Sequence, residues 1–248
     1  TKAKEVRYQF PERGSEKLSA RPIIVGAGPA GLFAALQLTE AGYAPIVLER
    51  GRSVEKRRQD VEKFWETGLL DPASNVQFGE GGAGTFSDGK LNTVVKDPSG
   101  RNQFVLETFV HYGAPEEITY ENKPHIGTDV LSQVIGNMRK DLIAKGAEFH
   151  FESCVKDLVI ENGRIAAVVT EEETYPASAV ILALGHSARD TFEMLDAKKE
   201  IPMEVKNFAV GFRVEHPQTM IDTIMYGDYR GAKLPASPYK VTSDFPNG

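Results

Sequence analysis

Two glycine-rich segments have residue types and spacings that could bind a nucleotide. Residues 26–31 read GAGPAG and residues 79–91 read GEGGAGTFSDGKL. The first segment matches G-x-G-x-x-G, the dinucleotide fingerprint, and so do Gly79 to Gly84 of the second. The second segment also contains G-x-x-x-x-G-K, the start of a P-loop, which ends at Lys90. The neighbouring residues decide which of these patterns can hold a phosphate.

The first segment has the surroundings that the fingerprint requires. The β-branched run Ile23–Val25 predicts a buried strand before it, and Pro29 suits the first turn of a following helix. Phosphates would then lie on unpaired N–H groups at the helix start. The next predicted strand, 46–48, ends at Glu49, whose carboxylate suits a ribose diol. We therefore expect dinucleotide binding here, with these cofactor contacts: Gly26, Gly28, Gly31, Glu49 and Arg50.

The second segment fails as either phosphate motif. Leu91 occupies the Ser/Thr position of a P-loop, and TFSDG after Gly84 cannot start a packed helix. Two interpretations stay open: a flexible surface loop, or a backbone-lined cradle for a flat or anionic ligand. Lys90 would bring a positive charge to a flavin or an anionic substrate, or else be a solvated surface lysine.

The order of the later strands distinguishes FAD from NAD. Residues 148–184 read as successive strands with a two-residue hairpin signal at Asn162-Gly163, and they end at an apolar strand followed by Gly185. An NAD-type domain would continue with βαβ units instead. This antiparallel meander resembles the FAD domain of glutathione-reductase-type flavoproteins. Glu49 also argues against a 2′-phosphate on the ribose, although Arg50 lies beside it.

We therefore predict an α/β fold: an FAD-binding Rossmann-like domain with a central parallel sheet and an antiparallel β-meander, and a second, smaller α+β region. The predicted FAD domain comprises residues 20–70 and 121–190, and the second region comprises 71–120 and 191–248. Within them we expect helices at 53–65, 101–112 and 129–145, a strand near Ile118, and a strand-like segment at 205–216. Predicted N-caps are Ser53 for the first helix and Thr128 or Asp129 for the third. We expect the Arg57-Arg58 pair to lie on a solvated face.

Four longer motifs carry a resemblance to a known family. They are NVQFGEGGAGTFSDGKL, KPHIGTDVL, VILALGHSARDTFEML and NFAVGFRVEHPQ. Together they resemble the FAD-dependent protein C family, bacterial flavoproteins also called NAD(FAD)-utilising dehydrogenases, from about Pro22 to the end of the chain. The resemblance implies that Pro29 and Ala30 join the fingerprint glycines and Glu49 in binding the ADP portion of FAD. It also implies that the glycine loop, including Gly82, Ala83, Gly84 and Thr85, approaches the flavin. It further implies that Val155 lies near adenine and that Gly185 to Arg189 lie close to the FAD. Such families continue with a segment that closes over the isoalloxazine, so we expect a longer whole protein.

The predicted function is that of an FAD-binding oxidoreductase with hydride transfer through flavin N5, an unknown small-molecule substrate, and NADH or NADPH as a transient donor. The candidate catalytic residues are Lys90 and His186, although His186 could equally cap a helix. Arg189 would lie near pyrophosphate or form a helix-start ion pair with Asp190. The alternatives are a module with structural or regulatory FAD, or a flavin-dependent RNA-modification protein.

Composition and net charge argue against several classes of binding partner. The net charge of −6 provides no basic surface for nucleic acid or anionic membranes, and no apolar run approaches the roughly 20 residues that span a bilayer. Cys154 is the only cysteine, so we expect a cytoplasmic protein without an internal disulfide. The five histidines lack metal-ligand spacing, so we expect no metal site. Nothing in the sequence specifies the oligomeric state.

Overall fold

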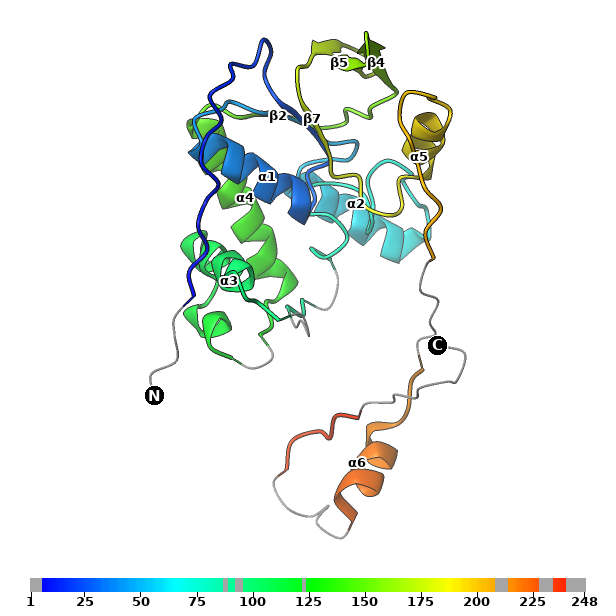
Figure 1. Cartoon of the computed structure of the whole chain (residues 1–248). Coiled ribbons are helices and arrows are strands. Elements are labelled where there is room, and N and C mark those ends of the chain that lie inside the picture. The colour runs from blue at the N-terminus through cyan, green and yellow to red at the C-terminus, as the bar shows by residue number, and fades with distance from the viewer. Residues whose placement is uncertain are drawn as a thin grey trace. The chain divides into compact units, whose positions relative to one another are not determined.

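The computed structural model describes residues 6–86, 89–91, 96–121, 124–207, 214–227 and 234–239. The chain divides into two compact units, Thr1–Met203 and Glu204–Gly248. The first unit contains the described strands and every described helix except α6 (Gln218–Tyr226), which belongs to the second unit (Figure 1).

A four-stranded parallel sheet forms the centre of the first unit. Its strand order is β3-β2-β1-β7, and each neighbouring pair is parallel. Both β1 and β2 are buried along their whole length, as expected for parallel strands covered on two faces. The strands are β1 (Ile23–Val25), β2 (Ile46–Leu48), β3 (Glu148–His150) and β7 (Val180–Leu182).

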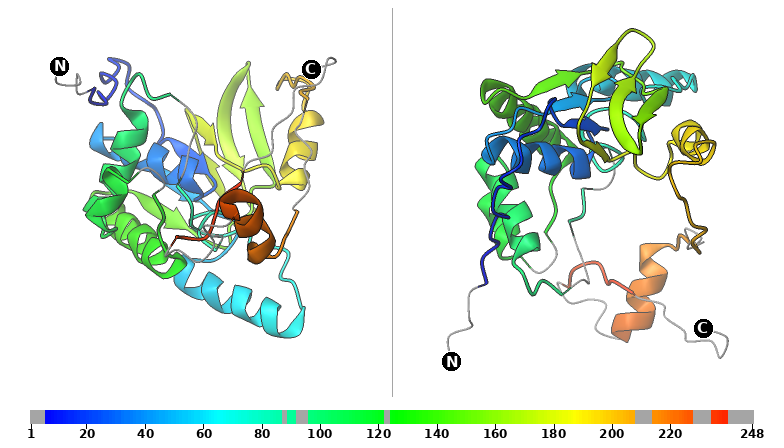
Figure 2. Two further views of the ribbon diagram at one scale, coloured as in Figure 1. Left: turned by 90° about the horizontal axis from the view of Figure 1, so that it is seen from below. Right: turned by 45° about the horizontal axis from the view of Figure 1, so that its top comes forward.

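A separate antiparallel meander lies in the chain between β3 and β7 (Figure 2). It comprises β4 (Asp157–Glu161), β5 (Arg164–Val169) and β6 (Thr174–Pro176). Asn162 and Gly163 connect β4 to β5 with φ of 52° and 74°, the positive values that a two-residue hairpin of type I′ requires. The parallel sheet and the meander confirm the predicted fold class.

The long helices follow the predicted ranges closely. They are α1 (Pro29–Glu40), α2 (Val54–Thr67), α3 (Arg101–His111) and α4 (Thr128–Ala144). The predicted strand near Ile118 is wrong, because this residue lies in the 3₁₀ helix η1 (Glu116–Thr119), where its buried side chain joins the core. Helix α5 (Arg189–Asp196) begins at the residues that one of the two interpretations of Arg189 gave as a helix start, whereas α6 was not predicted. In the described part of the chain, no helix is both long and apolar enough to cross a membrane.

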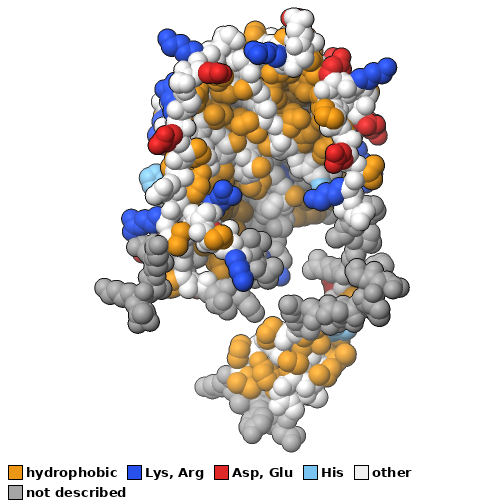
Figure 3. All heavy atoms as spheres, in the orientation of Figure 1, with side chains coloured by type: hydrophobic (Ala, Val, Ile, Leu, Met, Phe, Trp, Pro, Cys, Tyr) orange, Lys and Arg blue, Asp and Glu red, His pale blue; other side chains and the backbone are white. Residues whose placement is uncertain are grey.

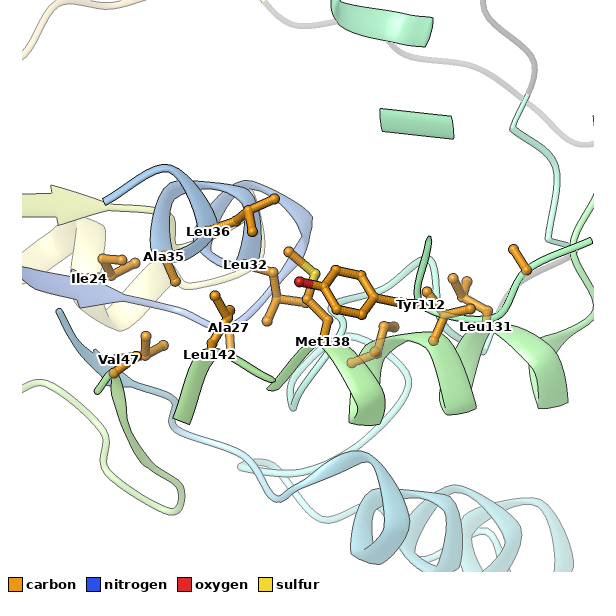
Figure 4. Close-up of a cluster of buried hydrophobic side chains, with 14 of the residues drawn as sticks. Ile24, Ala27, Leu32, Ala35, Leu36, Val47, Tyr112, Leu131, Met138 and Leu142 are labelled. Atoms are coloured by element: carbon orange, nitrogen blue, oxygen red, sulfur yellow. The ribbon is translucent and has the colours of Figure 1, made fainter. Parts of the chain in front are cut away.

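Two apolar layers cover the two faces of the parallel sheet. Side chains alternate along each strand, so Ile24 and Val47 belong to one hydrophobic cluster, whereas Val25 and Leu48 belong to the other. Helices α1 and α4 and residue Tyr112 complete the first cluster (Figure 4). The meander and α5 contribute to the second.

The predicted division into two discontinuous regions stays a prediction. Within the first unit, however, Tyr112, Ala114 and Ile118 pack in the same cluster as α1 and α4. Of the strand-like segment at 205–216, residues 208–213 lie outside the described residues.

Candidate nucleotide-binding site

A cavity of about 640 Å³ lies at the carboxyl ends of β1, β2 and β7. In parallel α/β sheets, ligands bind at this end of the strands. Figure 3 shows hydrophobic side chains gathered in the middle of one face of the first unit, with charged side chains around them. The lining residues that the sequence predicted are Gly26, Gly28, Pro29, Ala30, Glu49, Arg50, Gly82, Ala83, Gly84, Val155, Gly185 and His186.

The first glycine cluster, residues 26–31, forms the turn between β1 and α1. Gly28 is the N-cap of α1, and the first helical hydrogen bond runs from Leu32 N to Gly28 O at 2.9 Å. The amides of Ala30 and Gly31 therefore belong to the helix start, where N–H groups lack intrahelical acceptors. Gly31 does not line the cavity; a Cβ there would overlap the carbonyl oxygen of Gly26. It serves close packing, whereas Gly28 faces the cavity.

The second glycine cluster, residues 79–84, packs directly on the first. Gly81 N donates to Ala27 O at 2.8 Å. A Cβ at Gly82 would lie 3.0 Å from Pro29 Cδ and 3.2 Å from Gly28 Cα. The two clusters thus form one continuous backbone wall of the cavity. Thr85, predicted to approach the flavin, is fully buried and is not part of this wall.

Glu49 joins the two clusters through its carboxylate. Its Oε2 accepts a hydrogen bond from Ala27 N at 2.7 Å, and its Oε1 accepts from Gly51 N at 2.9 Å and Gly79 N at 3.1 Å. The residue is 5% exposed and lines the cavity. A carboxylate has about four acceptor positions, and backbone amides occupy three of those of Glu49.

Arg57 is the clearest error of the sequence analysis, since it is fully buried rather than solvated. Its Nε donates to Asn75 O at 2.8 Å, and Nη1 donates to Glu80 O at 2.7 Å and Gly82 O at 2.9 Å. The guanidinium carbon lies 4.9 Å from the centroid of the Phe86 ring. Burial lowers the pKa of Arg57 to about 10, which leaves the side chain charged at neutral pH.

The adjacent Arg58 differs from Arg57 in its surroundings. It is half-buried and pairs with Asp129 at 3.0 Å. The two arginines diverge because adjacent helix positions do not share a face, and the glycine loop covers only the Arg57 face of α2.

Glu80 fastens the glycine loop to two helices. It is fully buried; its Oε2 accepts from Val54 N at 2.7 Å, and its Oε1 lies 2.8 Å from Arg139 Nε as an ion pair without a well-aligned hydrogen bond. Burial raises the pKa of the Glu80 carboxyl to about 7. Ser53 occupies the predicted N-cap position of α2, but its side chain makes no cap hydrogen bond. Glu80, distant in sequence, supplies the acceptor instead.

The predicted cap of α4 is wrong. Gly127 is the N-cap, with φ of −58° and ψ of 148°, so Thr128 and Asp129 already lie inside the helix. The carboxylate of Asp129 instead pairs with Arg58 of α2.

Arg50 fastens the start of α5 to the end of β2. Its Nη2 donates to Asp190 Oδ1 at 2.8 Å and to Thr191 Oγ1 at 2.9 Å. Its guanidinium carbon lies 4.5 Å from the centroid of the Phe78 ring. Asp190 therefore pairs with Arg50, while Arg189 is exposed and does not line the cavity.

The two candidate catalytic residues lie in different surroundings. His186 is exposed and lines the cavity, with Nδ1 3.2 Å from Ser187 Oγ. Lys90 is exposed, forms an isolated antiparallel bridge with His125, and does not line the cavity. Both catalytic roles stay predictions.

Sequence reasoning missed several cavity-lining residues. Thr191 carried a weak signal, because polar residues follow an apolar strand there. Phe78 and Phe192 lie in two of the motifs that carry the family resemblance, but no role was assigned to them. Ser187 falls within the predicted range Gly185 to Arg189, so the missed residues include Phe78, Ser153, Thr191 and Phe192.

Similar proteins were found by structure and by sequence. Thermovibrio ammonificans THI4 covers 74% of this chain at a TM-score of 0.47 and 20% identity, and 64% of that chain is covered. Glycine oxidase from Bacillus cereus covers 72% at a TM-score of 0.38 and 16% identity, and 58% of it is covered. At these TM-scores the similarity adds nothing to the fold assignment, which rests on the strand topology.

An uncharacterized protein of Clostridium beijerinckii is 48% identical over 230 residues, which make up 92% of this chain. The chain spans 43% of that relative's length. Residues 207–248 match the family described as "FAD-dependent protein, C-terminal domain-like". This match covers the C-terminal segment alone and supports an assignment to an FAD-dependent protein family.

Proposed function

We propose that this chain forms the FAD-holding part of a flavin-dependent oxidoreductase. One observation carries the proposal: two glycine clusters meet at the start of α1 and form one wall of a cavity of about 640 Å³. This volume lies within the range of cofactor and ligand pockets.

The residues of the cavity fit the ADP portion of FAD. The start of α1 offers unpaired amides and the positive end of the helix dipole to the pyrophosphate. The wall is free of side chains where phosphates would approach: a Cβ at Gly84 would meet no atom within 4 Å, and at Gly28 it would lie 3.7 Å from Gly82 Cα. The fourth acceptor position of Glu49 suits a ribose hydroxyl.

The meander side of the cavity fits the adenine ring. Val155 and Leu195 are buried among the lining residues, and Phe192 lines the same region from α5. We place adenine against this apolar surface, with the backbone of Val155 at the edge of the base. Arg50 keeps α5 in place and so defines the width of this part of the cavity.

When bound, FAD would supply hydride transfer at its N5 atom. The residues of this chain would bind and orient the dinucleotide, and the imidazole of His186 could hold a proton beside it. NADH or NADPH is the proposed transient donor. The substrate is left open, because substrate pockets vary independently of the fold.

The full-length protein tests the proposal by its visible absorbance after FAD reconstitution. We expect a yellow protein that bleaches when NADH or NADPH is added anaerobically. Gly28→Val should abolish the colour by filling the phosphate cradle. Gly14→Val, at an exposed position with no atom within 4 Å of a Cβ, should leave it unchanged. A colourless wild-type protein would reject FAD binding, and a yellow protein that neither nucleotide reduces would favour a structural or regulatory FAD.

A further inference from the structure

The buried guanidinium of Arg57 donates hydrogen bonds to several backbone carbonyls in and just before the glycine loop. It contacts the oxygens of Asn75, Glu80 and Gly82 within 2.9 Å, and Gly79 O at 3.4 Å. An arginine has five donors and no acceptor, so it can bind several carbonyls at once. These contacts fix the direction in which each of those peptide groups points.

The direction of a carbonyl also determines the direction of an amide. In a planar trans peptide group, the C=O and the following N–H point to opposite sides, and the described residues contain no cis peptide. The Glu80 carbonyl points to Arg57, and the amide of the same peptide group, Gly81 N, donates away from it to Ala27 O at 2.8 Å. The next carbonyl that Arg57 binds, that of Gly82, likewise directs the Ala83 amide away from the guanidinium.

The Ala83 amide lies where a ligand can use it. Ala83 is exposed and lines the cavity, and its N–H makes no hydrogen bond to any described residue. The preceding Gly82 lies against Gly28 and Pro29 at the start of α1. The peptide group that carries the Ala83 amide therefore follows directly on the contact between Gly82 and the first cluster.

We propose that Arg57 is a positioning residue that turns the carbonyls of the glycine loop away from the cavity and presents the Ala83 amide to the diphosphate of a bound dinucleotide. The second glycine cluster would then extend the phosphate cradle of the first. This inference rests on the proposed function, because it requires a dinucleotide in the cavity.

Two ligands that differ only in the diphosphate can distinguish a role of Arg57 at the diphosphate from a general structural role. ADP and adenosine differ only in the diphosphate, so calorimetric titration of the full-length protein with both isolates its contribution. For Arg57→Met we expect the ADP dissociation constant to rise about tenfold or more, as for the loss of one charge-assisted hydrogen bond, with adenosine within about twofold of wild type. Arg58→Met, the matched control on the same helix, should leave both constants unchanged.

A folded Arg57→Met protein that binds ADP like wild type, or that loses ADP and adenosine affinity equally, would overturn the inference. A wild-type protein that binds neither FAD nor ADP would instead reject the proposed function. If Arg57→Met does not fold, amide hydrogen exchange on the wild type decides. ADP should slow exchange in residues 79–86 more than adenosine does, and equal slowing by the two ligands would contradict the proposal.

Discussion

The two glycine clusters line the same cavity but are held in different ways. The first, residues 26–31, lies between a strand and a helix and includes the local backbone contact of Gly31 with Gly26. The second, residues 79–84, lies outside helices and strands and depends on buried charged side chains, chiefly Arg57 and Glu80. The first part of the wall is therefore shaped mainly by the strand and helix that flank it, and the second part mainly by polar contacts with buried side chains. Substitutions should therefore affect the two clusters by different mechanisms.

The largest effect should come from the packing glycine of the first cluster. In Gly31→Ala, the new methyl group would overlap the Gly26 carbonyl. The methyl group and the Gly26 carbonyl are both attached directly to the backbone, so they can separate only if α1 moves. We expect the free energy of unfolding to fall by about 3 kcal/mol. Urea unfolding measures this, with Gly14→Ala as the control at an open position. Wild-type stability of Gly31→Ala would show that the turn does not need this close approach.

The second cluster should respond to pH through Glu80. Burial raises the pKa of this carboxyl from 4.5 to about 7, so the folded protein binds the proton more tightly than the unfolded chain. Stability from this group is fully present below pH 4.5 and is lost as the pH rises to about 7, by about 3 kcal/mol.

Glu80→Gln should remove this pH dependence, because the amide does not titrate. Glu62→Gln, an exposed change on α2, should keep the wild-type profile. Unfolding free energies measured from pH 4.5 to 8 check both variants. A Glu80→Gln profile parallel to that of the wild type would assign the slope to other groups.

Glu49→Gln should weaken both clusters together. The carboxylate of Glu49 accepts hydrogen bonds from three backbone N–H groups, whereas a glutamine side chain has only one carbonyl oxygen. Its NH₂ group must therefore face at least one of these N–H groups, which loses its acceptor. We expect a loss of about 2 kcal/mol in stability and weaker FAD binding. Thermal unfolding and FAD titration measure these effects. Loss of FAD affinity at unchanged stability would indicate that Glu49 serves the ligand alone.

The smallest effect on stability should occur at Gly84. A Cβ there meets no atom within 4 Å, so Gly84→Ala should change the free energy of unfolding by less than about 0.5 kcal/mol. Because Gly84 lines the cavity, FAD affinity should still fall measurably. A destabilised Gly84→Ala protein with normal FAD affinity would contradict our division between packing and cavity-facing glycines.

Local signals made much of the fold predictable. Glycine and proline mark the start of α1, and Asn162-Gly163 marks the hairpin. The β-branched runs mark the buried strands. Ile118 was misjudged because an apolar residue in a short segment fits a strand or a helical turn equally well. Only the start of α5, at Arg189 and Asp190, was among the interpretations, although its eight residues carry a clear amphipathic pattern from which the rest of the helix was predictable.

The site was predictable where it depends on the fingerprint and not where it depends on tertiary contacts. Gly28 and Glu49 line the cavity as expected. Arg57 lies in a charged helix that looks solvated, and only the fold brings the glycine loop over it. Likewise, nothing near Ser53 indicates that Glu80 would supply the acceptor at the start of α2.

The three backbone donors on Glu49 have a consequence for the entropy of binding. Ala27, Gly51 and Gly79 are held to one carboxylate by contacts within the chain itself. The turn after β1 and the glycine loop are therefore preorganised, and their conformational freedom is lost during folding rather than at binding. A dinucleotide would bind to a wall that is already ordered, so little of its binding free energy would be needed to order the loop.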